Sequence, residues 1–78
     1  MAINFVSMGN QDIINYNIKC KKTDLFVDLE KQLYRDYPQF KEVETYFQVG
    51  ATKINRFKTV EQNKIKDNDV ISVFRIDN

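Results

Sequence analysis

Residues 50–76 read GATKINRFKTVEQNKIKDNDVISVFRI, and this stretch decides the fold. Its opening glycine is typical of a turn, and Lys53-Ile54 begins a short returning strand. The Val60–Ile65 segment, apolar at both ends, indicates a turn or a short helix. The acidic-polar turn at 67–69 then precedes a closing strand, 70–76, with apolar residues at alternate positions. This half of the chain therefore predicts a strand-rich structure closed by its last strand.

The first part of the chain predicts a β-hairpin. Ile3 and Phe5 lie in a first strand, which ends near the turn-forming sequence Met8-Gly9-Asn10. Apolar and polar side chains then alternate in a second strand. This period of two is typical of a strand with one face on a core and the other in water. The apolar face of this strand consists of Ile14, Tyr16, Ile18 and Cys20.

One amphipathic helix follows the hairpin. Its apolar side chains recur at spacings of three, four and four residues: Phe26, Leu29, Leu33 and Tyr37. Thr23-Asp24 offers a side-chain cap at the start, and Pro38 ends the helix because a proline disfavours helical backbone in the residue before it. We expect a helix from Asp24 to Asp36 and a third strand from Glu44 to Val49.

The expected order of elements is two strands, one helix and two or three further strands. We therefore predict an α+β fold, a mixed four- to five-stranded sheet with one principal helix packed on one face. A single helix cannot cover both faces, so the other face stays in water. We expect a core made by Ile3, Phe5, Ile18, Cys20, Phe26, Leu29, Leu33, Ile54, Val60, Ile65, Ile71 and Val73.

Composition limits the kinds of partner. The chain has 78 residues, which predicts a single domain, 1–78, and its net charge is only +1. Such a balance provides no overall field to attract nucleic acid or an anionic membrane. No apolar run approaches the roughly 20 residues that span a bilayer, and the N-terminal residues lack the pattern of a signal peptide. We expect a protein partner, with no nucleic acid and no membrane, and a cytoplasmic or nuclear location.

Catalysis and metal binding are disfavoured by the residue types present. The chain contains no histidine and one cysteine, Cys20. A zinc site needs several Cys or His ligands, and a cysteine nucleophile normally needs a histidine base. A lone cysteine cannot form an internal disulfide, which fits a reducing compartment. We expect no catalytic residues, no cofactor and no metal site.

The apolar spacings and the closing segment DVISVF resemble those of ubiquitin-like domains of the ubiquitin and SUMO type. The similarity covers nearly the whole chain at low identity. It implies a β-grasp fold, in which the first strand is central, antiparallel to the second and parallel to the last. The order of elements alone also fits Ras-association, PB1 and sulfur-carrier domains. The chain departs from the family in a longer first hairpin, in the Tyr37-Pro38 exit from the helix and in an extra residue near Ala51-Thr52.

The resemblance also implies a binding surface, because members of this family bind through an apolar patch on the open sheet face. The corresponding positions are held by Met8, Phe47 and Phe74, with Lys53 or Arg75 at the rim. Alternation supports the outward direction of Phe74 independently, since Ile71 and Val73 are expected to face the helix. A shift of one residue in the third strand would put Tyr46 outward in place of Phe47.

A second candidate surface is the basic cluster Lys19, Lys21 and Lys22 beside the second strand. In SUMO-type domains this edge accepts an extended peptide flanked by acidic residues. The competing interpretation, which we favour, is a solvated strand face whose charges discourage edge pairing.

The function expected from these features is that of a non-catalytic, ubiquitin-like protein-interaction domain. It would act as an adaptor, as a monomer or subunit of a larger complex, or as the N-terminal domain of a larger protein. The segment Arg75-Ile76-Asp77-Asn78 lacks the diglycine that conjugated modifiers need. The alternative is a conjugatable modifier or sulfur carrier whose Gly-Gly tail lies beyond Asn78.

Overall fold

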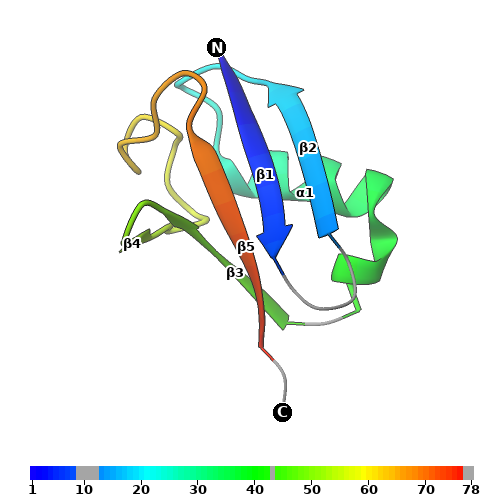
Figure 1. Ribbon diagram of the computed structural model, residues 1–78. Coiled ribbons are helices and arrows are strands. Elements are labelled where there is room, and N and C mark those ends of the chain that lie inside the picture. Colours follow the sequence, from blue (N-terminus) through cyan, green and yellow to red (C-terminus); the bar gives the residue numbers. More distant parts are fainter. Residues whose placement is uncertain (9–12, 43, 77–78) are drawn as a thin grey trace.

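A computed structural model of the protein describes residues 1–8, 13–42 and 44–76, and for Met8 and Ile13 it describes the backbone alone. The strands form one mixed sheet in the order β2-β1-β5-β3-β4, and α1 lies across one of its faces (Figure 1). The predicted α+β architecture, a mixed sheet with one principal helix, is therefore confirmed. The elements are β1 (Ala2–Met8), β2 (Ile13–Lys19), α1 (Phe26–Asp36), the 3-10 turn η1 (Pro38–Phe40), β3 (Glu44–Val49), β4 (Thr52–Lys53) and β5 (Val70–Ile76).

The strand pairing also follows the prediction. β1 is an interior strand, antiparallel to β2 and parallel to β5, and Phe5 is in register with Tyr16 on one side and Ile71 on the other. β3 pairs antiparallel with β5, and the two-residue β4 pairs with the end of β3. A parallel pair needs a long crossover connection. Here the helix and the second half of the chain provide it.

The start of the helix corrects one prediction. The helix begins at Phe26, and its N-cap residue, Leu25, makes no side-chain capping hydrogen bond. The carboxylate of Asp24 instead accepts the backbone N–H of Lys21 at 2.8 Å. The first-turn amides of Phe26 and Val27 donate to backbone carbonyls of the 56–58 segment, each at 2.9 Å. Tertiary contacts thus satisfy the donors that a capping side chain would otherwise serve.

The core lies between α1 and one sheet face. Every residue predicted for the core is buried, so that prediction is confirmed. At its centre three phenylalanine rings, Phe5, Phe26 and Phe47, meet edge to face with centroids 5.2–5.9 Å apart. Such T-shaped contacts are favourable beyond the apolar area that they bury. Ile14 and Phe40 complete the core.

The long segment between β4 and β5 is held in place by polar and apolar anchors. Val60 and Ile65 are buried, as predicted. The side chain of Asn63 accepts the amide of Asn55 at 2.8 Å and donates back to its carbonyl at 2.9 Å. Residues 55–58, which flank the outer edge of β3, are therefore fixed relative to the core.

Candidate functional site

Tyr46 and Phe74 form a stacked aromatic pair on the sheet face that α1 leaves uncovered. The two residues are direct partners across β3 and β5. Their ring centroids are 4.9 Å apart and their planes differ by 13°. Because side chains alternate along a strand, the neighbours Phe47 and Val73 point to the opposite face, where they are buried.

Two further side chains extend this pair. Ile76 follows Phe74 by two residues and so shares its face, and these side chains are 39% and 38% exposed. The ammonium group of Lys53 lies 5.5 Å from the centroid of the Tyr46 ring, within the range of a cation–π contact. We call Tyr46, Phe74, Ile76 and Lys53 the sheet-face patch. Its apolar side chains come from neighbouring positions on one face of β3 and β5, and its rim carries the positive charge of Lys53.

The expectation that Phe47 belongs to this patch is wrong. Phe47 is only 2% exposed and packs between Phe5 and Phe26 in the core. The register of β3 therefore differs by one residue from the register expected from the resemblance to ubiquitin-like domains. Tyr46 takes the outward position, as the alternative register predicted.

The other predicted patch residues fall in different places. Lys53 lies at the rim, beside Tyr46, as expected. Arg75 follows Phe74 directly and is in register with the buried Thr45, so its side chain leaves β5 on the helix-bearing face. Its placement at the rim of the open face is therefore wrong. The side chain of Met8 lies outside the described part of the chain.

The basic cluster lies at the other edge of the sheet. Lys19 ends β2, and Lys21 and Lys22 follow in the turn that leads to α1. All are exposed. The structure does not bring them near the sheet-face patch, because β1 and β5 separate β2 from β3. A function for this edge stays a prediction.

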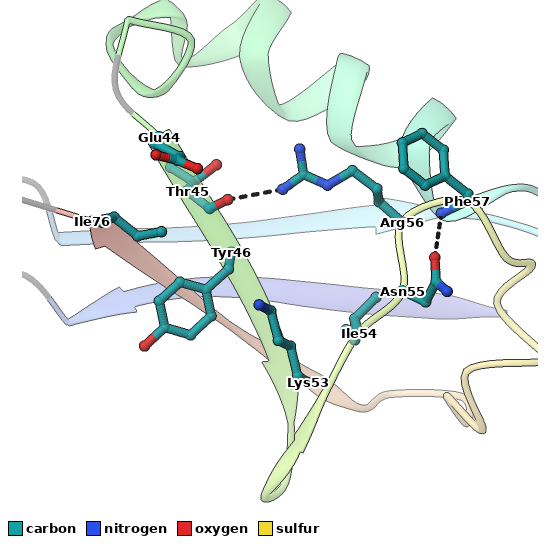
Figure 2. Close-up of a pocket in the computed structure, with 9 residues that line it drawn as sticks. All are labelled: Glu44, Thr45, Tyr46, Lys53, Ile54, Asn55, Arg56, Phe57 and Ile76. Carbon is teal, nitrogen blue, oxygen red and sulfur yellow. Dashed lines mark hydrogen bonds between the residues drawn. The ribbon is translucent and has the colours of Figure 1, made fainter.

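A groove of about 580 Å³ runs along the outer side of β3, between that strand and residues 54–57. Figure 2 shows Arg56 reaching from this segment to β3. One guanidinium nitrogen of Arg56 donates to the backbone carbonyl of Thr45 at 2.8 Å, and another lies 3.3 Å from a carboxylate oxygen of Glu30. The exposed ring of Phe57 lies at the end of the groove nearest α1.

A polar network thus joins helix, sheet and loop, and sequence reasoning missed it. The Tyr34 hydroxyl lies 2.6 Å from the same Glu30 oxygen and 2.6 Å from Oγ1 of Thr45. Burial, followed by the hydrogen bond to Glu30, raises the pKa of Tyr34 to about 12. One signal was available, because Glu30 lies four residues after Phe26 on the apolar stripe of the helix. No feature of the sequence identified Arg56 as the partner of Glu30.

The described residues contain no group of three or more His, Cys, Asp or Glu side chains that could hold a metal ion. Burial raises the pKa of the Cys20 thiol, which favours its protonated form over the thiolate. Within the same part of the chain, no helix has the length and apolar character needed to cross a membrane.

Neither models of known protein families nor curated proteins give a match to this chain.

Proposed function

We propose that this chain is a β-grasp, ubiquitin-like interaction domain that binds a protein partner through the sheet-face patch. The fold proposal is supported by the hairpin of β1 and β2, the single crossing helix and the parallel pairing of β1 with β5. The binding proposal is carried by one observation, the stacked and partly exposed pair of Tyr46 and Phe74.

An exposed aromatic pair is suited to binding. Aromatic side chains bury a large area, and few rotatable bonds are fixed when they are covered. Tyrosine is also enriched among the residues that dominate interface energies. The stack holds each ring against the other, so part of the ordering needed for binding exists before a partner arrives. The neighbouring Ile76 enlarges the apolar surface, and Lys53 provides a charge that can guide an acidic partner.

In this proposal the domain is an adaptor or an assembly subunit without catalytic activity, and it acts in the cytoplasm or the nucleus. Its chemistry is limited to recognition. The aromatic pair provides affinity, and the charged rim tunes the association rate and the choice of partner. The phenol of Tyr46 adds a hydrogen-bonding group at the centre of the surface.

Affinity capture from the cells that express this protein tests the proposal. The baits are the wild type and the variant Tyr46→Ala/Phe74→Ala, with Phe57→Ala as a matched control. Phe57 is 76% exposed and lies on the loop after β4, at the end of the groove nearest α1 and outside the sheet-face patch, so its removal tests the loss of an exposed ring with the patch intact. We expect the double variant to lose the partner and the control to retain it. Retention by the double variant would refute the proposal.

A further inference from the structure

The open face of β5 carries apolar side chains from one end of the strand to the other. Val70, Phe74 and Ile76 are separated by even numbers of residues, so all three lie on the face that α1 leaves uncovered (Figure 1). They are 51%, 38% and 39% exposed, and Tyr46 widens this stripe on β3. Two sheets can pack face to face when such side chains interdigitate. The stripe therefore has the form of a surface that another sheet can cover.

An acid and a base lie on opposite sides of the aromatic pair. Along β3, Glu44 precedes Tyr46 by two residues and Gln48 follows it by two. Lys53 is the direct cross-strand partner of Gln48. All of these side chains share the open face by alternation, and those of Glu44 and Lys53 are exposed. The surface is thus negative at one end, positive at the other and aromatic between them.

We propose that the partner at the sheet-face patch is a second copy of this chain, packed face to face about a two-fold axis. This inference rests on the proposed function, because it uses the same patch. The axis lies between the two sheets and crosses the strands at the level of Tyr46 and Phe74, so the two β3 strands run in opposite directions. The aromatic pairs meet at the centre, and each Glu44 lies over Gln48 of the second copy, beside Lys53.

The charges favour a second copy as the occupant of this face. A two-fold interface is isologous, so a contact between Glu44 of one copy and Lys53 of the second copy forms twice. The same symmetry brings the two apolar stripes together without a second kind of surface. The net charge of the chain is only +1, so long-range repulsion between two copies is small.

A charge swap tests this arrangement. Lys53→Glu places a carboxylate opposite Glu44 of the second copy, and it reverses the small net charge without enlarging it. Glu44→Lys/Lys53→Glu restores opposite charges in exchanged positions. The matched control, Lys19→Glu, makes the same exchange at an exposed lysine of β2, on the same face but at the far edge of the sheet. Sedimentation velocity from micromolar to millimolar concentration gives the mass, and concentration-dependent amide NMR shifts locate the surface.

We expect the wild type to shift toward the mass of two chains as its concentration rises, with the amide signals of β3 and β5 moving most. Lys53→Glu should raise the dissociation constant about tenfold or more, whereas the swapped double variant and the control should stay within about threefold of the wild type. A monomeric wild type, a double variant no tighter than Lys53→Glu, an equal loss in the control or shifts confined to β2 would each overturn the inference. If Lys53→Glu does not fold, Glu44→Lys replaces it, and the wild-type shifts still decide between the surfaces.

Failure of this inference is separable from failure of the proposed function. A monomeric wild type that captures a different protein, and loses it in the Tyr46→Ala/Phe74→Ala variant, would overturn the second copy as partner and leave the patch as a binding surface. A two-chain mass that persists in the Tyr46→Ala/Phe74→Ala variant would place the dimer contact elsewhere and overturn the inference.

Discussion

Replacing Phe47 by leucine should lower the free energy of unfolding by about 2–4 kcal/mol. The exchange removes three carbons from a side chain that is 2% exposed, and each buried carbon contributes about 0.8 kcal/mol. It also removes two edge-to-face contacts, with Phe5 at 5.8 Å and with Phe26 at 5.2 Å, each worth roughly 0.5–1.5 kcal/mol. Relaxation of the surrounding side chains recovers part of the loss.

Urea denaturation followed by circular dichroism measures this change. The matched control is Phe74→Leu, the same exchange on the open face. Phe74 is 38% exposed and makes one ring contact, the stack with Tyr46, so we expect a smaller loss there, of about 1 kcal/mol. Similar losses for the two variants, or a larger loss for Phe74→Leu, would refute the register that we assign to β3 and with it the composition of the sheet-face patch.

Three further substitutions test other parts of the structure. Leu33→Ala should destabilise by about 2–5 kcal/mol in the same urea assay, because it leaves a cavity under the helix; a near-neutral midpoint would contradict the assigned helix face. Gly50→Ala should cost about 1 kcal/mol, because residue 50 has φ +59° and an added Cβ meets no atom within 4 Å, so the loss is conformational strain alone. The neutral phenol of Tyr34, whose pKa rises from 10.0 to about 12 on folding, contributes stability that is complete below pH 10 and lost as the pH approaches 12. Tyr34→Phe should therefore show a smaller alkaline loss of stability than the wild type, and equal pH profiles would contradict this role.

The fold could be predicted because hydrophobic periodicity carries most of its information. The stripe formed by Phe26, Leu29 and Leu33 indicated the helix, and period-two alternation indicated the strands. The structure keeps both patterns because the apolar face of the helix packs against the apolar face of the sheet. The parallel pairing of the first and last strands followed from the family resemblance.

The candidate site was harder to predict, for reasons that lie in particular residues. Tyr46 and Phe47 are adjacent and both aromatic, so alternation alone could not say which of them faces the core. The predicted helix cap failed for another reason. The Asp24 carboxylate accepts a hydrogen bond from the backbone of Lys21, and the first amides of the helix donate to backbone carbonyls of the 56–58 segment. Arg56 joins groups that are distant in sequence, and a single sequence gives no signal for such a contact.

The dissociation constant of the captured partner for wild-type and Phe74→Ala protein tests the proposed function most directly. A central aromatic anchor is commonly worth 2 kcal/mol or more, so we predict a loss of affinity of about 30-fold or greater. Thermal unfolding of the two proteins should stay within a few degrees, since the truncated ring lies outside the core. An unchanged dissociation constant in a folded Phe74→Ala protein would contradict binding through the sheet-face patch.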